Sequence, residues 1–384
     1  MAEDKNIHEL TFDELDLEDN LLRGIYAYGF EKPSRIQHLS IPIINKGTDI
    51  IAQSQSGTGK TGAFSIGILN NIDESMKKTQ YIIVTPTHEL AKQIYDVIIN
   101  LSEYMNVSVA KVIGKTNIRE SIQELSKDPQ IIVATPGRLL DMIDKKHIFT
   151  DSIKALVLDE ADEMLSYGFM ETIHNIIRTI PPQSQICLFS ATMPQEIIDL
   201  TSNFMKDPEE LLINKEKLTL EGIRQFYVDL KQYKWKYDVL LDIYETINIT
   251  QSIIYVNSKN MLNNLNERLL NENYPISYIH GDMDQNTREK NLSDFKTGKT
   301  RILLSTDLLA RGIDIQQLSL VINFDLPRDK ETYIHRIGRS GRYGRKGVAI
   351  NFVTDEDIGK LKEIESYYNI NIEAMPQNLG EHLI

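Results

Sequence analysis

The sequence predicts an α/β protein with two tandem domains, each built from a parallel sheet flanked by helices. Short apolar, β-branched segments alternate with longer segments of helical periodicity, and this alternation runs through both halves of the chain. The length of 384 residues suits two or three domains that each bury their own core. A charged stretch with a proline, residues 206–222, interrupts the alternation. We expect an acidic segment at 1–20, a first domain at 21–207, a linker at 208–222 and a second domain at 223–384.

The expected strands follow from the apolar segments. In the first half they are residues 49–52, 81–85, 107–113, 130–134, 155–159 and 185–189. In the second half they are residues 251–256, 276–279, 301–305, 320–324 and 348–353. Strands that alternate with helices form parallel sheets, whose ligand-binding loops follow the carboxyl ends of the strands.

The composition limits the class of protein. The chain is 41% hydrophobic and 25% charged, which is ordinary for a globular protein. One cysteine, Cys187, excludes an internal disulfide and a zinc site with several thiolates. The acidic start lacks the apolar part of a signal peptide, and no run of about 18 apolar residues is present to span a membrane. The net charge of −13 argues against a general nucleic-acid binder, so any such site should be local, and the stretch 328–346 is basic.

A glycine-rich turn follows the first expected strand, in the sequence IIAQSQSGTGKT. Glycines let backbone N–H groups surround phosphates, Lys60 can reach the β and γ oxygens, and the Thr61 hydroxyl can bind Mg²⁺. The expected phosphate cradle consists of Ser56, Gly57, Thr58, Gly59, Lys60, Thr61 and Gly62. An ordinary strand–helix turn is the less favoured alternative. Ser54 stands where the motif has glycine, and a residue of that size should be tolerated.

Carboxylates and arginines supply the remaining candidates for phosphate chemistry. At the end of the strand expected at 155–159, Asp159 would hold Mg²⁺ and Glu160 would orient or deprotonate the attacking water. The alternative is a surface acidic turn. In the basic stretch, Arg339 and Arg342 are suited to stabilising the γ-phosphate charge in the transition state, which would require the two domains to close. The alternative is a patch that contacts only nucleic-acid phosphates.

Together these motifs resemble those of a known family. The order of GTGKT, PTHELA, TPGR, DEAD, SAT, ARGID and HRIGRSGR is similar to that of the DEAD-box RNA helicases, from about residue 12 to the C-terminus. The resemblance implies two RecA-like domains, ATP and Mg²⁺ as cofactors, and RNA-stimulated ATP hydrolysis that separates short RNA duplexes. Segments such as HGDMDQNTRE resemble the translation-initiation branch, whereas GRSGRYGRKG also resembles the exon-junction branch, which would act as an ATP-gated clamp on RNA. A DNA helicase or another ATPase is a third, disfavoured alternative.

The resemblance also implies roles around the nucleotide. Gln37 would read the adenine, Phe30 would stack on its ring, and Phe12 would be a further aromatic contact. For both phenylalanines, core packing is the equal alternative. Three further nucleotide contacts are implied, at Lys32, Asp314 for the ribose, and Tyr343. The residues implied to couple the ATP site to the rest of the protein are Asp162, Ser190, Thr192, His335 and Arg336.

The implied RNA face consists of loop residues that offer backbone N–H groups to phosphates. They are Pro86, Thr87, Gly114, Thr135, Pro136, Gly137, Arg138, Asn257, Gly281, Asp282, Arg288 and Thr306. His88 replaces the arginine of the family motif, and Lys115 replaces a glycine. We expect Lys115 to offset the weaker residue at 88 in part, through a phosphate contact. The resemblance further implies a monomer that binds RNA independently of sequence and works with scaffold and RNA-binding accessory proteins. It also implies a cytoplasmic protein, with the nucleus as the alternative.

Overall fold

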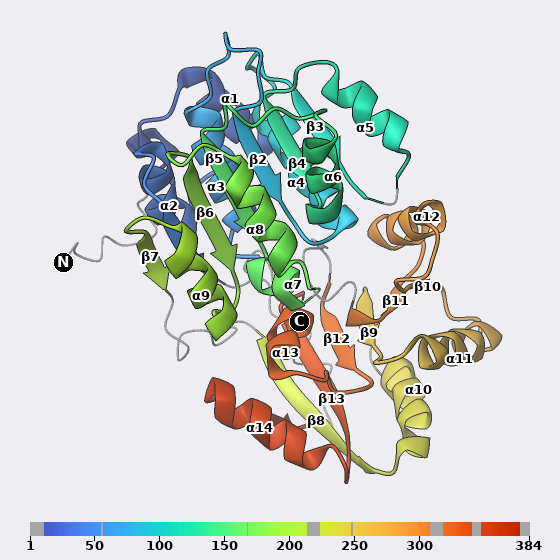
Figure 1. Ribbon diagram of the computed structural model, residues 1–384. Coiled ribbons are helices and arrows are strands. Elements are labelled where there is room, and N and C mark those ends of the chain that lie inside the picture. Colours follow the sequence, from blue (N-terminus) through green and yellow to red (C-terminus); the bar gives the residue numbers. More distant parts are fainter. Residues whose placement is uncertain are drawn as a thin grey trace. The chain divides into compact units, whose positions relative to one another are not determined.

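The computed structural model describes residues 11–54, 57–114, 116–166, 168–212, 223–246, 249–307, 318–339 and 347–376 (Figure 1). The chain divides into two compact units, Met1–Ile213 and Asn214–Ile384, each with a seven-stranded parallel sheet. Within the described residues, no helix is long and apolar enough to cross a membrane.

The sheet of unit 1 has the strand order β3-β4-β2-β5-β6-β1-β7. Its strands are β1 (Ile50–Gln53), β2 (Tyr81–Val84), β3 (Val109–Val112), β4 (Ile131–Ala134), β5 (Ala155–Asp159), β6 (Gln185–Ser190) and β7 (Glu209–Leu212). The central strands are buried on both faces, which matches their continuous apolar sequences.

Helices cover both faces of this sheet. Alternate residues of the strands pack against one set of helices, which comprises α1 (Asp19–Tyr28), α2 (Arg35–Asn45), α3 (Lys60–Asn70) and α4 (His88–Leu101). The opposite set comprises α5 (Ile118–Leu125), α6 (Pro136–Asp144), α7 (Ala161–Ser166), α8 (Met170–Thr179) and α9 (Gln195–Phe204). The side-chain period of two in a strand therefore sorts the core into two layers.

Unit 2 repeats the topology of unit 1. Its strand order is β10-β11-β9-β12-β13-β8-β14, so β8 corresponds to β1, β9 to β2 and β12 to β5. The strands are β8 (Ile223–Lys231), β9 (Ser252–Tyr255), β10 (Ile276–Ile279), β11 (Ile302–Ser305), β12 (Leu320–Asn323), β13 (Gly347–Thr354) and β14 (Glu373–Ala374). Around them lie α10 (Lys236–Thr246), α11 (Lys259–Asn271), α12 (Gln285–Lys296), α13 (Lys330–Ile337) and α14 (Ile358–Tyr368).

The expected fold class is confirmed, and each expected strand has an observed counterpart whose ends differ by at most a few residues. Three strands were not expected. β7 occupies the start of the segment expected as a linker and pairs with β1, although its side chains are largely exposed and two of them are glutamates. β8 and the short β14 were missed because only one face of β8 carries buried residues and β14 has two exposed ones. Residues 213–222 of the expected linker lie outside the described residues.

The acidic segment at the N-terminus also contributes to the core. The 3₁₀ helix Phe12–Leu15 (η2) buries Phe12 completely, and the Phe12 ring lies parallel to that of Phe30 at a centroid distance of 6.3 Å. The core alternative for Phe12 is therefore correct, and its buried ring is not available to stack on a base.

Candidate nucleotide and nucleic-acid sites

The glycine-rich turn connects β1 to α3. Gly57 and Gly59 have φ angles of 85° and 101°, in the left-handed region that glycine adopts without strain. Ser54 is buried, and its hydroxyl lies 2.6 Å from that of Thr58, so serine fits where the motif has glycine. Lys60 is the first residue of α3, and its ammonium donates to the Ser54 carbonyl at 2.9 Å. Thr61 and Gly62 follow in the first turn of α3, whereas Ser56 lies outside the described residues.

Two carboxylates meet Lys60 at the carboxyl edge of the sheet. The Lys60 Nζ atom lies 3.6 Å from Glu160 Oε2, and both side chains are about 5% exposed (5% and 4%). Asp159, at the end of β5, is 2% exposed and its Oδ1 atom has no hydrogen-bond partner. Burial, with the neighbouring Glu160 charge, raises the pKa of the Asp159 carboxyl, while Lys60 opposes the shift. Two buried carboxylates share one cation here, so a further positive charge would be stabilising.

This arrangement fits a magnesium ion bound together with phosphate. Among the described residues, no group of three or more His, Cys, Asp or Glu side chains could hold a metal alone. Mg²⁺ commonly takes only one or two protein ligands and completes its coordination with phosphate oxygens and water. The unpartnered oxygen of Asp159 and the Thr61 hydroxyl are suitable ligands of this kind.

The expected coupling residues of unit 1 lie together. The Thr192 hydroxyl donates to Asp162 Oδ2 at 2.6 Å, and the Ser190 hydroxyl donates to the Thr192 carbonyl at 2.6 Å. The Asp162 N–H group points to the Ser190 hydroxyl at 3.4 Å. The end of β6 is therefore tied to the start of α7, directly after Asp159 and Glu160.

Gln37 lies beside the glycine turn and forms part of a capping box at the start of α2. Its Oε1 atom accepts from the Ser34 N–H at 2.8 Å, and its Nε2 atom donates to the Gly59 carbonyl at 3.2 Å. A Cβ atom at Gly62 would lie 2.5 Å from Gln37 Nε2 and 3.1 Å from Phe30 Cε2, so Gly62 permits this close approach. A primary amide has two N–H groups and two lone pairs, so these two bonds use one N–H group and one lone pair of Gln37.

Phe30 is half-buried between Phe12 and Tyr28, and its contact with Tyr28 is edge-to-face at 4.9 Å. Lys32 is exposed on the segment that follows. Both residues lie in the chain segment just before Gln37.

The RNA residues expected in unit 1 follow three neighbouring strands, β3, β4 and β2. Thr87 caps α4, accepting from the Leu90 N–H at 3.3 Å, and Thr135 precedes α6, which has Pro136 at its start. The Gly114 N–H donates to the Thr135 hydroxyl at 2.9 Å, which connects the ends of β3 and β4. Two helix N-termini at adjacent strands present N–H groups suited to phosphate oxygens.

The remaining residues of this face have mixed accessibility. Gly137 is exposed, whereas Pro86 is buried. The Arg138 guanidinium donates to Ser121 Oγ at 3.0 Å and to the Thr116 carbonyl at 2.9 Å, so in this structure it supports the loop before α5. Lys115 lies outside the described residues.

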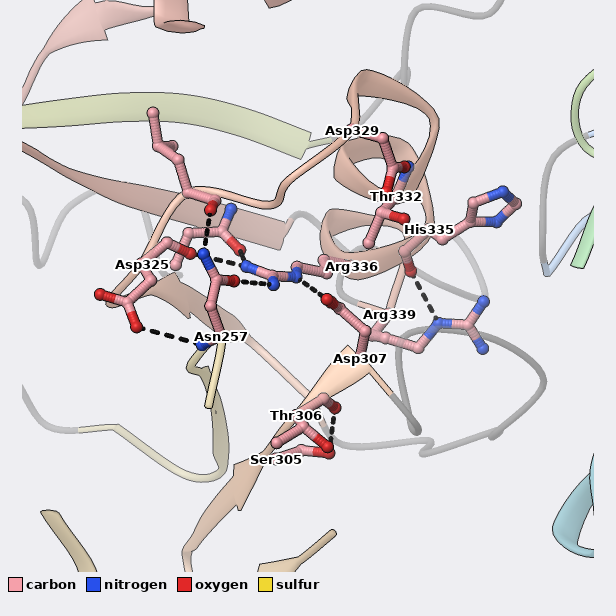
Figure 2. A network of polar contacts seen from close by, with 12 residues as sticks. Asn257, Ser305, Thr306, Asp307, Asp325, Asp329, Thr332, His335, Arg336 and Arg339 are labelled. Carbon is pink, nitrogen blue, oxygen red and sulfur yellow. Dashed lines mark hydrogen bonds and ion pairs between the residues drawn. The ribbon is translucent and has the colours of Figure 1, made fainter. Parts of the chain in front are cut away.

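In unit 2 the site residue Arg336 is completely buried. Its guanidinium lies in a network of polar contacts (Figure 2). Its Nε atom donates to Asp307 Oδ1 at 2.5 Å and its NH2 atom to Asn257 Oδ1 at 2.8 Å. The NH1 atom donates to Asn323 Oδ1 at 3.2 Å and to the Asp325 carbonyl at 2.6 Å. The planar guanidinium thus joins α13 to the ends of β9, β11 and β12.

Asn257 was expected to contact RNA, but its side chain has structural partners. Besides accepting from Arg336, it donates from Nδ2 to the Leu326 carbonyl at 2.8 Å. Gly281 and Asp282 are exposed after β10, and Asp282 pairs with Lys259 at 2.8 Å. Arg288 is buried and donates to the Gly281 carbonyl at 3.2 Å, so it supports this loop, while Thr306 is half-buried after β11.

Arg339 follows α13 and is 1% exposed, and its Nε atom donates to the His335 carbonyl at 3.2 Å. His335, on α13 itself, is also buried. The expected nucleotide residues Asp314, Arg342 and Tyr343 lie outside the described residues.

The sequence interpretation missed the partners of Arg336. Asp307, Asn323 and Asp325 all lie at the carboxyl ends of predicted strands. This position in the sequence could have identified them as site residues. It also missed Lys236, a buried lysine whose Nζ atom lies 3.0 Å from Asp325 Oδ1. Lys236 stands among other charged residues, a pattern typical of an exposed segment, so the sequence does not indicate that it is buried.

The parallel sheet and the glycine turn, with a buried lysine and carboxylates, define unit 1 as a P-loop nucleotide-binding domain. The chain belongs to the DEAD-box family of ATP-dependent RNA helicases, as three comparisons show. The family model "DEAD/DEAH box helicase" matches residues 34–200, and "Helicase conserved C-terminal domain" matches residues 235–344. The chain is 51% identical to the ATP-dependent RNA helicase eIF4A of Meyerozyma guilliermondii and also to that of Neurospora crassa. Each alignment covers 97% of this chain and 94% of the relative.

Solved structures of related proteins have the same fold. Dbp5 of S. cerevisiae, bound to RNA and ADP BeF3, is 36% identical with a TM-score of 0.90, over 97% of both chains. Mss116p bound to ssRNA and AMP-PNP is 28% identical with a TM-score of 0.86, over 98% of this chain and 81% of that chain. The expected family and its enzyme class are confirmed, and the clamp alternative is not favoured.

Proposed function

We propose that this chain hydrolyses ATP at the glycine turn of unit 1 and uses the reaction to separate short RNA duplexes in translation initiation. The observation that carries the proposal is the buried Lys60–Glu160 pair beside the unpartnered oxygen of Asp159. Lys60 binds the β and γ phosphates, and Glu160 orients and deprotonates the attacking water. The backbone N–H groups of residues 56–62 surround the phosphates.

Asp159 and the Thr61 hydroxyl would hold Mg²⁺. The ion supplies positive charge to the phosphate oxygens as negative charge develops on the leaving group. Burial raises the pKa of Asp159, and a bound cation would favour its ionised form. The protein residues otherwise bind and orient the nucleotide: Gln37 at the adenine edge, and Phe30, Lys32, Asp314 and Tyr343 around the base and sugar.

RNA binds through phosphate contacts that are independent of sequence. The N-termini of α4 and α6 supply this chemistry in unit 1, and the loops after β10 and β11 supply it in unit 2. Contacts to 2′-hydroxyls favour RNA over DNA.

The two units act as the domains of one ATP- and RNA-dependent switch. ATP and RNA both favour an arrangement in which Arg339 and Arg342 approach the γ-phosphate, so each ligand tightens the binding of the other. The domains are those expected, 21–207 and 223–384, except that β7, at the start of the segment 208–222, belongs to the sheet of the first domain. Scaffold and RNA-binding accessory proteins of the initiation type bind this monomer in the cytoplasm.

The test is ATP turnover with and without single-stranded RNA, with single-stranded DNA in a parallel experiment. The wild-type rate should rise with RNA and much less with DNA. The Glu160→Gln variant should bind ATP but turn it over about 100-fold more slowly or worse, since it lacks the general base. Glu171→Gln, an exposed change on α8, is the matched control and should keep the wild-type rate. Equal rates with and without RNA, or a fully active Glu160→Gln variant, would contradict the proposal.

A further inference from the structure

The common strand order of the two sheets places a second lysine–carboxylate pair in unit 2. In unit 1, Lys60 is the first residue of the helix that follows β1, and it pairs with Glu160, directly after β5. In unit 2, β8 corresponds to β1, and Lys236 is the first residue of the helix that follows it. Lys236 pairs with Asp325, in the turn after β12, which corresponds to β5. The pair therefore occurs at the same topological position in both units.

The surroundings of Lys236 differ from those of Lys60. Residues 232–235 connect β8 to α10 through the 3₁₀ turn Tyr233–Trp235 (η4), and this connection is shorter than residues 54–59 and has no glycine. The Tyr233 ring lies over the Lys236 ammonium at 4.4 Å, and the Phe324 ring lies 5.5 Å away. Lys236 is 2% exposed and also donates to the Phe324 carbonyl at 2.5 Å. Its ammonium is enclosed by these groups, and residues 232–235 do not form a glycine loop of the kind that surrounds a phosphate.

Asp325 connects this lysine to Arg336. Its Oδ1 atom accepts from Lys236 at 3.0 Å, and its Oδ2 atom accepts from the Asn257 N–H at 3.0 Å. Its backbone carbonyl accepts from Arg336 NH1 at 2.6 Å, and Asn257 Oδ1 accepts from Arg336 NH2 at 2.8 Å (Figure 2). Of the groups that accept from the Arg336 guanidinium, the carbonyl belongs to Asp325 itself, and the Asn257 side chain belongs to a residue whose backbone N–H donates to Asp325.

We propose that Lys236 is a positioning residue for ATP hydrolysis. It occupies in unit 2 the place that Lys60 has in unit 1, but it binds Asp325 instead of a phosphate. Lys236 fixes the position of Arg336 through Asp325 and Asn257. Arg336 in turn fixes the end of α13, and Arg339 lies just after this end. The inference rests on the proposed function, because it assigns the arginines after α13 to the ATP reaction.

The physical reason is the charge balance of a buried cluster. Removal of the Lys236 ammonium leaves the Asp325 carboxylate, whose side chain is 14% exposed, without its cation. A buried, uncompensated carboxylate attracts the next cation in reach, and Arg336 already contacts the carbonyl of the same residue. A guanidinium drawn toward this carboxylate loses its bonds to Asn257 and Asn323, and α13 shifts with it.

The experiment compares three variants of the full chain with the wild type. Lys236→Met removes the charge and keeps the length of the side chain. Lys236→Met combined with Asp325→Asn removes both charges of the pair, so no uncompensated charge remains. Lys234→Met is the matched control, since Lys234 is exposed on the same turn. RNA-stimulated ATP turnover gives kcat and KM, and binding of a fluorescent ATP analogue gives nucleotide affinity and stoichiometry.

Lys236→Met should lower kcat at least fivefold and leave the KM for ATP and the analogue affinity within twofold. The double variant should recover at least half of the wild-type kcat, and Lys234→Met should retain all of it. One analogue should bind per chain in each protein, because the Lys236 position is not a nucleotide site. If Lys236 had only a structural role, its replacement would lower thermal stability without lowering kcat selectively over KM.

Several results would overturn the inference. The first is a Lys236→Met variant with the wild-type kcat. The second is a double variant whose kcat does not recover. The double variant still decides the question if Lys236→Met alone does not fold. A second bound analogue that Lys236→Met removes would identify a nucleotide site instead. A wild-type chain without RNA-stimulated turnover would overturn the proposed function as well. An active wild type with a fully active Lys236→Met variant would overturn this inference alone.

Discussion

Thr192 donates its hydroxyl hydrogen to the Asp162 carboxylate, with Oγ1 and Oδ2 2.6 Å apart. Both side chains are buried, and they join the turn after β6 to the helix that begins one residue before Asp162. A hydrogen bond to a charged acceptor contributes more than one between neutral groups, so this contact should be measurable in the stability of unit 1.

Thr192→Val keeps the shape of the side chain and removes the donor. We expect it to lower the free energy of unfolding of unit 1 by about 1.5–3 kcal/mol, the usual range for a bond to a charged group. Urea unfolding followed by circular dichroism would measure the change. Thr192→Ser retains the hydroxyl and should lose clearly less; equal stability of the valine variant and the wild type would contradict the role of this bond.

Asp159 predicts a specific dependence of stability on pH in metal-free protein. Its pKa is raised by burial, so between the unfolded value near pH 4 and the higher folded value the folded state binds more protons than the unfolded state. Its contribution to the free energy of unfolding therefore decreases as the pH rises through this window. Asp159→Asn cannot ionise, so relative to the wild type it should gain on the order of 1–3 kcal/mol at pH 8 and little at pH 4.

Urea unfolding with EDTA at pH 4, 6 and 8 would test the effect of Asp159. Asp151→Asn, a change at an exposed position, serves as the control and should show no such gain. A constant difference between Asp159→Asn and the wild type at all three pH values would refute the assignment.

Gly62→Ala tests the close packing of Gln37 against α3. The added Cβ would lie 2.5 Å from Gln37 Nε2 and 3.1 Å from Phe30 Cε2, so the glutamine must leave its place beside Gly59. We expect the KM for ATP to rise about tenfold, equivalent to about 1.4 kcal/mol of binding free energy. Steady-state ATP turnover measures it.

Gly359→Ala is a matched change in α14, where an added Cβ would meet nothing within 4 Å. It should leave the KM unchanged and raise the stability of unit 2 by about 0.5–1 kcal/mol, because alanine is the better helix former. An unchanged KM in Gly62→Ala would show that Gln37 moves without consequence for ATP.

Arg336→Lys tests the planar network of unit 2. Lysine has one ammonium in place of the fork that donates to Asp307, Asn257, Asn323 and the Asp325 carbonyl. We expect a loss of about 3 kcal/mol or more in the stability of unit 2, since buried acceptors lose their donors. Arg268→Lys, at an exposed arginine whose guanidinium lies over the Tyr237 ring, should cost about 1 kcal/mol or less. Similar losses for the two variants would argue against a special role of the network.

Much of this protein could be predicted from local sequence. The buried strands are continuous apolar segments, and the GTGKT turn, the DEAD carboxylates and the SAT residues follow strand ends whose positions the pattern indicates. β7 was not predicted because an edge strand with two exposed glutamates looks like a linker, and only its pairing with β1 identifies it.

The sequence by itself determined the two α/β units, the glycine-rich turn and the family, because these depend on residue periodicity and short motifs within continuous segments. The tertiary structure decided which polar residues act together. It buried Phe12, gave Asn257 a structural role and joined Lys236 to Asp325, whose positions in the chain are far apart. Such contacts depend on the order of strands in the sheet, which brings distant strand ends to one edge, and the spacing of residues along the chain does not encode that order.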